Sequence, residues 1–385
     1  MQDVYVVSAA RTAIGKANKG TLAKYRPDEM AAAVVKEAVN RSGVPAERFQ
    51  DIVLGCAFPE GAQGMNVARI AGARAGIPYT VPGSTINRFC SSGLESQAIV
   101  AAKIEAGLLD AAVAGGVESM SAIPMGGLKY DPNPELTREH PEVYIGMGHC
   151  GDNTAREFNI TREEMDEWAL RSNHHAVNAI DKGLFTDEIV PLDVPTPNGP
   201  VRFDTDEGPR RDTNLEALSK LRPAFATPDR GFCTAGNSSQ TSDGAAAVCL
   251  MSKKAIDELG VTPIARFRGY AVAAGDPRFL GPAQLEAIPR ACALAGITVE
   301  DLDLIENNEA FASQCLYVIR EMGFDVEKVN VNGGAIALGH PLGCTGAKLT
   351  VQILHEMKRR SARYGLVTMC IGGGMGAAGV FELCT

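Results

Sequence analysis

The sequence lacks the excess of basic residues that nucleic-acid binding requires. It has 37 Lys and Arg against 46 Asp and Glu, and its formal net charge is -9 at pH 7. Because nucleic-acid phosphates are held by clustered Lys and Arg, we expect no nucleic-acid partner. Local basic residues can still hold a small phosphorylated ligand.

The chain also lacks a long apolar run. No stretch reaches the roughly 18 apolar residues that a transmembrane helix needs. Met1 is followed almost at once by the strand-like run Val4-Tyr5-Val6-Val7, without the pattern of a signal peptide. We therefore expect no transmembrane segment and a cytoplasmic protein.

No cysteine or histidine spacing is typical of a metal site. The ten cysteines are scattered, with no C-x-x-C pair and no His/Cys ligand pattern. Neither a zinc site nor a disulfide framework is indicated. We expect most of these cysteines to be small buried packing residues, so a catalytic role for any one depends on its neighbours.

Apolar runs of two kinds alternate along the chain. Strand-like runs at 51–54, 111–114 and 365–369 alternate with helical patterns at 28–41 and 94–106. With 385 residues and 45% hydrophobic content, the chain can form more than one core. The alternation predicts α/β layers around buried, mainly parallel strands.

The chain repeats part of its pattern once. Residues 42–49 resemble residues 295–302, which lie 253 positions later. Residues 90–93, at the start of a predicted helix, are matched 250 positions later by residues 340–343. Two offsets that agree so closely predict two similar α/β halves.

We expect the first half at residues 1–118, completed by about 246–262, and the second at 263–385. The insert between them, 119–245, is rich in Pro and charge and contains one clear helix, 161–182. Such a segment is typical of a loop domain that covers a site. A surface elaboration without a role is the alternative.

Two residues at predicted helix starts are candidates for nucleophilic chemistry. Cys90 follows a turn-forming segment and precedes small residues and a helix. The positive end of the helix dipole favours its thiolate, with a packing cysteine as the equal alternative. His340 lies between Gly339 and Pro341 at a turn into a helix, where its ring can face a cavity.

Two predicted strand ends carry further candidates. Cys370 ends an apolar run and is followed by Gly372 in a glycine-rich turn, whose free N–H groups can form an oxyanion hole. Asn308 places an amide at the end of another predicted strand. These strand ends therefore offer a thiol, an amide and free N–H groups.

Four blocks resemble the signature blocks of the thiolase family, in the family's order. They are residues 87–94 around Cys90, 308–312, 332–341 with Asn-Gly-Gly and Gly-His-Pro, and 370–376 with its glycine run. The similarity runs from Arg11 to Glu382. By this resemblance the chain is identified as a member of the family, which implies a thiolase-like fold of two layered halves (αβαβα) with an inserted loop domain.

The resemblance implies a site of two cysteines, a histidine and an asparagine. Cys90 would take the acyl group as a thioester after His340 removes its proton, and Cys370 would act as acid and base on the substrate α-carbon. His340 and a water held by Asn308 would stabilise the enolate oxygen. The backbone N–H groups of Cys90 and Gly372 would bind the thioester oxyanion, and no metal is required.

Coenzyme A would be a substrate rather than a permanently bound cofactor. Residues 234–239 resemble the family's pantetheine-contact segment, which points to Ala235 and Ser239. Arg210 falls where the family places a basic residue that binds the nucleotide. A solvated charge is the alternative for Arg210, because Arg211 adjoins it.

Two details resemble the degradative 3-ketoacyl-CoA thiolases (acetyl-CoA acyltransferases) of fatty-acid β-oxidation. The nucleophile block at 90–93 reads Cys-Ser-Ser-Gly, and residues 145–148 lack the ring residue that biosynthetic members place before the Met. An acetoacetyl-CoA thiolase working in the condensation direction is the alternative. Phe89 and the pair Glu95-Ser96 depart from the degradative pattern and leave the preferred chain length open.

Two other functions are weighed against this one. A ketoacyl synthase would pair its cysteine with a second His or an Asn where Cys370 stands. An inactive lipid-carrier relative of the fold would lack at least one of the four residues above, and all four are present. The resemblance further implies a homodimer or homotetramer acting on acyl-CoA and CoA, and degradative members can join a hydratase/dehydrogenase partner.

Overall fold

The chain folds into two similar α/β halves with a long insert in the first. The computed structural model describes residues 3–384. The main elements of the first half are β1 (Val4–Thr12), α1 (Pro27–Ser42), β3 (Ile52–Gly55), α2 (Val67–Arg74), β4 (Gly83–Ile86), α3 (Ser92–Glu105), β5 (Ala111–Ser119) and β9 (Ser242–Ser252). The short β2 (Gly15–Lys16) follows β1, and α8 (Lys253–Leu259) follows β9.

The second half repeats this order. Its elements are β10 (Ala265–Ala274), α9 (Pro282–Ala295), β11 (Leu304–Asn307), α10 (Ala312–Met322), the short α11 (Ala335–Leu338), α12 (Leu342–Arg360), β12 (Tyr364–Ile371) and β13 (Met375–Leu383). A single parallel bridge between Ile305 and Val329 stands where the first half has β4.

The insert leaves the first half after β5 and returns at β9. It contains α4 (Pro134–Glu139), α5 (Met147–Glu157), α6 (Arg162–Asp181), β6 (Ile189–Val190), β7 (Leu192–Val194), β8 (Val201–Phe203) and α7 (Leu215–Ser219). The helix expected here is α6, which begins with a capping box between Thr161 and Glu164. Apart from α5, the other helices and strands of the insert are short, so their sequence patterns are weak.

The strands form a mixed sheet, and the expectation of mainly parallel strands is wrong. The order is β11-β12-β13-β10-β1-β9-β5-β3-β4. β3 is parallel to β4 and β5, and β11 is parallel to β12, because helices connect these strands. β9 is antiparallel to β5 and β1, and β13 to β12 and β10. β9 returns through the insert and β13 through a tight turn, without a crossover helix.

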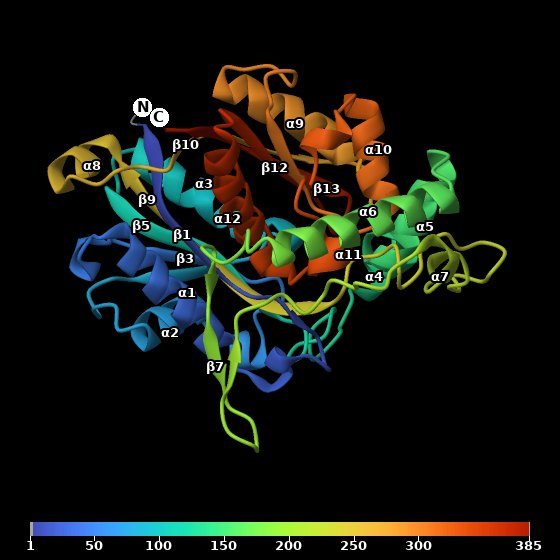
Figure 1. Cartoon of the computed structure of the whole chain (residues 1–385), viewed down its shortest axis with the longest axis horizontal. Coiled ribbons are helices and arrows are strands. Elements are labelled where there is room, and N and C mark those ends of the chain that lie inside the picture. Colours follow the sequence, from blue (N-terminus) through green and yellow to red (C-terminus); the bar gives the residue numbers. More distant parts are fainter. Residues whose placement is uncertain (1–2, 385) are drawn as a thin grey trace.

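Three hydrophobic cores separate five layers. α1 and α2 pack on one face of the first half's strands, through Val34 and Ala71 among others. α9 and α10 cover the second half's strands in the same way, through Ala287 and Val318. The middle core holds α3 and α12 between strands of both halves, and Figure 1 shows both helices near the middle of the molecule. The predicted α/β layering is therefore confirmed.

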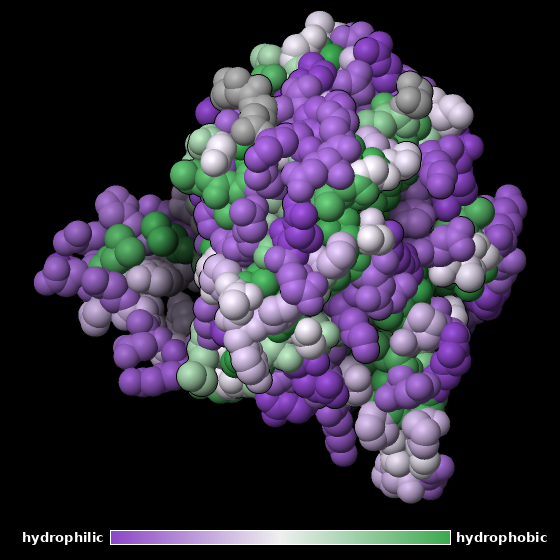
Figure 2. Space-filling model, turned by 90° about the vertical axis from the view of Figure 1, so that its left-hand side faces the viewer, coloured by the Kyte–Doolittle hydropathy of each residue, from purple (hydrophilic) through white to green (hydrophobic). Residues whose placement is uncertain are grey.

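The hydrophilic surface and the burial of the cysteines agree with what the sequence predicts. No helix between residues 3 and 384 combines the length and the hydropathy needed to cross a bilayer. On the face shown in Figure 2, hydrophilic residues predominate and apolar ones form small separate groups. All ten cysteines are free and nine of them are buried, as expected of packing residues.

Candidate active site

Cys90 lies in a 3-10 turn that leads directly into α3. Phe89 adopts a left-handed backbone with φ +41°, and the Asn87 side chain accepts the Phe89 N–H at 2.8 Å. Gly93 lets α3 approach α12 closely, because a Cβ there would lie 2.6 Å from the backbone nitrogen of Ala347. The nucleophile candidate is thus placed where α3 meets the first turns of α12.

The pKa of Cys90 is higher than its place at a helix start suggests. Burial raises the pKa of this thiol to about 11, although hydrogen bonds from the N–H groups of Gly372 and of Cys90 itself act to lower it. The expectation that the helix start favours the thiolate is therefore wrong. The residue is 8% exposed, and loss of hydration outweighs the dipole. Cys90 needs a base to become a nucleophile.

His340 can supply that base. Its backbone N–H donates to the Gln240 carbonyl at 3.0 Å, and its Nδ1 lies 2.6 Å from Thr345 Oγ1. The Thr345 hydroxyl donates to the Pro341 carbonyl at 3.0 Å, so Nδ1 carries the ring hydrogen and Nε2 keeps its lone pair. Burial, and after it the Lys348 ammonium, lowers the pKa of His340 to about 3. The imidazole is therefore a neutral base near pH 7.

Asn308 faces this imidazole from the end of β11. Its Nδ2 lies 3.3 Å from His340 Nε2, and its backbone N–H donates to the Thr368 carbonyl at 2.9 Å. Asn308 Oδ1 is buried and has no partner among the described residues. Because buried amide oxygens normally accept a hydrogen bond, this one is suited to bind water or substrate.

Cys370 and Gly372 lie where β12 turns into β13. The turn uses left-handed backbone at Gly373 and Gly374, with φ +82° and +74°. It directs the Gly372 N–H to the sulfur of Cys90. Burial, and then the neighbouring Cys90 thiol, raises the pKa of Cys370. Cys370 is therefore a protonated thiol at neutral pH and can donate a proton.

The structure brings the sequence candidates together in two contacting groups. Cys90 joins Cys370 and Gly372, and His340 joins Asn308. The side chain of Leu342, two residues after His340, lies in the same small apolar cluster as Cys90. The two groups therefore meet at the start of α12.

A buried carboxyl beside Asn308 ties the site to the insert. Glu309 accepts hydrogen bonds from Trp168 Nε1 at 3.1 Å and Ser172 Oγ at 2.6 Å, both on α6. These bonds hold the loop after β11 against α6. The sequence analysis assigned no role to Glu309, and the available signal was a Glu two residues after an apolar strand, inside a signature block.

A second buried carboxyl, Glu118 at the end of β5, crosses from one half to the other. It accepts the backbone N–H groups of Ala57 at 2.7 Å and Gly343 at 2.8 Å, and the side-chain amide of Gln63 at 2.5 Å. Gly343 follows His340 by three residues, so Glu118 holds the His340 turn in place relative to the first half. Nothing in the local sequence marks this Glu as buried.

Arg210 and Ala235 line one groove on the insert side. Asp212, Asn214 and Leu218 belong to the same lining. The Arg210 side chain is exposed and forms no ion pair within residues 3–384, whereas Arg211 pairs with Asp181 at 2.6 Å. An exposed guanidinium without a carboxylate is suited to hold a phosphate.

Ser239 lies outside the lining of this groove. Its backbone N–H donates to the Ala310 carbonyl at 3.0 Å, and Gln240, the next residue, lines the groove and also bonds the His340 backbone. The segment from Ala235 to Gln240 thus leads from the groove to the catalytic candidates. Within the part of the chain that the structure describes, no cluster of three or more His, Cys, Asp or Glu could hold a metal ion.

The fold and the site define a class of protein. It is a layered α/β enzyme of two similar halves, with two buried protonated thiols, Cys90 and Cys370, and a neutral imidazole, His340, near the start of α12. Comparison with models of protein families identifies the family within this class. The model described as "Thiolase, N-terminal domain" matches residues 4–254, and that of "Thiolase, C-terminal domain" matches residues 261–383. The chain belongs to the thiolase family.

Individual relatives cover the whole chain. It is 53% identical to the 3-ketoacyl-CoA thiolase of Bacillus subtilis strain 168, over an alignment of 393 positions that covers 100% of both chains. It is 45% identical to the acetyl-CoA acetyltransferase of Cupriavidus necator, over 98% of both chains. The crystal structure of human mitochondrial 3-ketoacyl-CoA thiolase matches with a TM-score of 0.92 and 37% identity, over 100% of this chain and 99% of that one. The predicted thiolase-like fold is confirmed.

Proposed function

We propose that the chain is a 3-ketoacyl-CoA thiolase of fatty-acid β-oxidation. It transfers an acyl group to CoA through a thioester on Cys90 and releases acetyl-CoA. The strongest support is the meeting of a neutral His340 with two buried thiols, Cys90 and Cys370, in a chain of this family.

In the first half-reaction, His340 Nε2 takes the Cys90 proton, and the thiolate attacks the 3-keto carbon. The bond between this carbon and the α-carbon then breaks. The acyl group stays on Cys90, and the α-carbon takes a proton from Cys370 as acetyl-CoA leaves. His340, with a water held by Asn308, stabilises the enolate oxygen of the leaving acetyl-CoA.

In the second half-reaction, the Cys370 thiolate takes the proton of the incoming CoA thiol. The CoA sulfur attacks the thioester carbonyl, and acyl-CoA leaves Cys90. The N–H groups of Gly372 and Cys90 would hold the oxyanion of this step, and their hydrogen bonds to the Cys90 sulfur support this role. The proton of CoA thus replaces the one that Cys370 gave to acetyl-CoA, and His340 returns its proton to the Cys90 thiolate as acyl-CoA leaves, so no proton is gained or lost overall.

The groove with Arg210 and Ala235 is the proposed CoA site. Arg210 would hold a phosphate of the nucleotide at the exposed end, and Ala235 would contact the pantetheine. Ser239 would contact the inner end of the pantetheine, since its segment leads toward His340. CoA enters as a substrate and leaves as acyl-CoA, so no permanently bound cofactor is needed.

The degradative subtype is supported by open space at Gly146, next to Met147. The Met147 sulfur lies 3.5 Å from where a Cβ would stand on Gly372, so α5 begins against the catalytic turn. A Cβ on Gly146 would meet only His149 Cδ2, at 3.6 Å. A longer acyl chain would therefore find room here. The acetoacetyl-CoA alternative has its own support, because similar relatives are named acetyl-CoA acetyltransferase.

The test is a thiolysis assay that follows loss of 3-ketoacyl-CoA absorbance with free CoA. Acetoacetyl-CoA and 3-ketodecanoyl-CoA are compared on wild type and on Cys90→Ala, with Cys384→Ala as a matched cysteine control. We expect the wild type and the control to cleave both substrates, and Cys90→Ala to lose at least about a thousandfold in kcat. Cleavage of acetoacetyl-CoA alone would assign the protein to the biosynthetic group. Full activity in Cys90→Ala would overturn the mechanism.

The assembly and its setting are also proposals. β4 ends the strand order and leaves an open edge, and Met65 and Tyr79 nearby in the chain are 93% and 80% exposed. Open edges and exposed large apolar side chains favour association, here as a homodimer or a dimer of dimers. We place the protein in the cytoplasm, where a hydratase/dehydrogenase could supply its 3-ketoacyl-CoA.

A further inference from the structure

One buried carboxylate lies between the turn that carries Cys90 and the turn that carries His340. Glu118 is the next-to-last residue of β5 and is fully buried. Its Oε2 accepts two backbone N–H groups, that of Ala57 at 2.7 Å and that of Gly343 at 2.8 Å. A single oxygen atom therefore joins the loop after β3, in the first half, to the first turn of α12, in the second half.

The other contacts of Glu118 are also with hydrogen-bond donors. Its Oε1 accepts the Phe58 backbone N–H at 3.3 Å and the Gln63 side-chain amide at 2.5 Å, and it lies 3.7 Å from the Cys56 thiol. An ionised carboxylate only accepts hydrogen bonds and can satisfy this whole set. A Gln side chain would instead turn its NH₂ group toward other donors, so these contacts distinguish Glu from Gln at this position.

On the side of His340, the backbone packs directly against Glu118 and β5. A Cβ on Gly343 would lie 2.7 Å from Glu118 Oε2, and a Cβ on Gly116 would lie 2.0 Å from the Gly343 carbonyl oxygen. His340 precedes this first turn of α12, and its ring is held within the turn by Thr345, at 2.6 Å from Nδ1. The position of the ring therefore follows the position of the turn that Glu118 holds.

On the side of Cys90, a path of hydrogen bonds continues from Ala57. The Ala57 carbonyl accepts Asn87 Nδ2 at 2.9 Å, and Asn87 Oδ1 accepts the Phe89 N–H at 2.8 Å. Phe89 directly precedes Cys90 and has a left-handed backbone with φ +41°, which needs support from its surroundings. Ala57 and Leu342 also lie in the small apolar cluster that contains Cys90. Glu118 is thus connected to both turns of the site.

We propose that Glu118 is a positioning residue, whose carboxylate holds the Cys90 turn and the His340 turn at the separation that lets His340 take the Cys90 proton. It acts through Gly343 on one side and through Ala57 on the other. A shared anchor matters because a shift of about 1 Å in a reacting group can cost about a hundredfold in rate. The inference rests on the proposed role of His340 as the base.

The test measures alkylation of Cys90 by iodoacetamide at pH 7 without substrate, read by mass spectrometry of the Cys90 peptide. A base in the right place speeds the attack of a protonated thiol, so His340→Asn sets the slow limit, at least about tenfold below the wild type. We expect Glu118→Gln to be alkylated about tenfold more slowly than the wild type, because its NH₂ group displaces one of the two turns. Glu118→Gln combined with His340→Asn should be no slower than His340→Asn alone.

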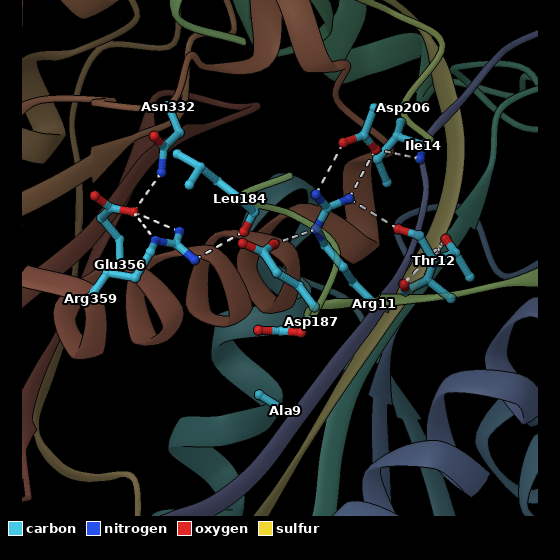
Figure 3. A network of polar contacts seen from close by, with 12 residues as sticks. Ala9, Arg11, Thr12, Ile14, Leu184, Asp187, Asp206, Asn332, Glu356 and Arg359 are labelled. Carbon is cyan, nitrogen blue, oxygen red and sulfur yellow. Dashed lines mark hydrogen bonds and ion pairs between the residues drawn. The ribbon is translucent and has the colours of Figure 1, made fainter. Parts of the chain in front are cut away.

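Two further variants separate positioning from loss of stability. Asn87→Ala breaks the same path on the side of Cys90, so adding it to Glu118→Gln should slow alkylation no further than the slower single variant. Glu356→Gln is the matched control. Glu356 is a buried carboxylate on α12 that accepts hydrogen bonds from Asn332 at 2.8 Å and Arg359 at 2.7 Å (Figure 3). Its loss should lower the melting temperature and leave the alkylation rate unchanged.

The outcomes distinguish this inference from the proposed function. Wild-type alkylation of Glu118→Gln overturns the inference, as does an equal loss in Glu356→Gln, which would mean that the rate follows stability. If Glu118→Gln does not fold, Glu118→Asp is measured with the same expectation, because its carboxylate is drawn back by one methylene. Equal rates in the wild type and His340→Asn would overturn the base and this inference with it. Alkylation needs no turnover, so thiolysis by the wild type tests the proposed function separately.

Discussion

At the scale of single residues, the site consists of groups that burial keeps uncharged. The Cys90 and Cys370 thiols are protonated because burial raises their pKa values, and the His340 imidazole is neutral because burial lowers its own. A neutral acid and a neutral base side by side can exchange a proton once a substrate carbonyl accepts the developing charge. The site can therefore begin a proton transfer from groups that are all uncharged.

The lowered pKa of His340 predicts a pH dependence of stability. The value falls from 6.5 to about 3 on folding, so between these values the unfolded chain binds a proton that the folded chain does not. The contribution is complete above pH 6.5 and is lost as pH falls toward 3. We expect His340→Gln to reduce this loss by up to about 1.4 kcal/mol per pH unit, measured by denaturant unfolding at pH 7 and pH 5. Burial also lowers the pKa values of His175 and His355, so these two residues still contribute to the pH dependence of stability in the variant. An unchanged pH slope in the variant would contradict a buried neutral His340.

The open space at Gly146 leads to a prediction about the length of the acyl chain that the enzyme accepts. We expect Gly146→His to lower kcat/KM for 3-ketodecanoyl-CoA by about tenfold or more, because the ring would fill the open space before Met147. Activity on acetoacetyl-CoA should stay within about twofold, since its short chain does not need that space. The two substrates are compared on the same enzyme batch, with Gly146→Ala as the control. Equal losses on both substrates would mean that this space does not hold the acyl chain.

At the scale of elements, the close packing of α3 on α12 brings the two halves of the site together. Cys90 stands at the start of α3 and His340 just before α12, and both helices lie in the middle core. The distance between Cys90 and His340 therefore depends on how closely these helices approach. Gly93 allows that approach, since a Cβ there would lie 2.6 Å from the Ala347 nitrogen.

Replacing this glycine tests the arrangement. We expect Gly93→Ala to lower the free energy of unfolding by about 1–3 kcal/mol, because the helices must separate. Thiolysis should fall with it, as the base moves from the thiol. Gly275→Ala is the control, because a Cβ at Gly275 meets nothing within 4 Å. Denaturant midpoints and thiolysis rates are measured for both, and a tolerant Gly93→Ala would show that the helices adjust without cost.

At the scale of the whole molecule, the open edge at β4 predicts association. We expect the wild type to run in light-scattering chromatography at twice or four times the 40.6 kDa chain mass. The double variant Met65→Asp, Tyr79→Asp should shift toward the single chain, because charge on an apolar contact opposes burial. Leu294→Asp, which changes an apolar residue of α9 that is 66% exposed, should not. A wild type that elutes as one chain would contradict the proposed dimer.

Local sequence patterns by themselves predicted much of this protein. The helical periods gave α1, α3 and α6, and the repeat offsets anticipated that the second half repeats the order of the first. Motifs pointed to Cys90 and His340, whose catalytic roles stay predictions, as do the domain boundaries. These features are predictable because periodicity and turn chemistry depend on neighbouring residues.

Only the tertiary structure decided the rest. The strand directions were predicted wrongly, because β9 and β13 enter the sheet through an insert and a tight turn rather than a crossover helix. The protonation of Cys90 was predicted wrongly, because burial outweighs the helix dipole. Glu118 had no local signal at all and Glu309 had only its place in a signature block, since each is held by a partner more than a hundred residues away in the chain. Burial and charge pairing are properties of the folded chain, so no local pattern can contain them.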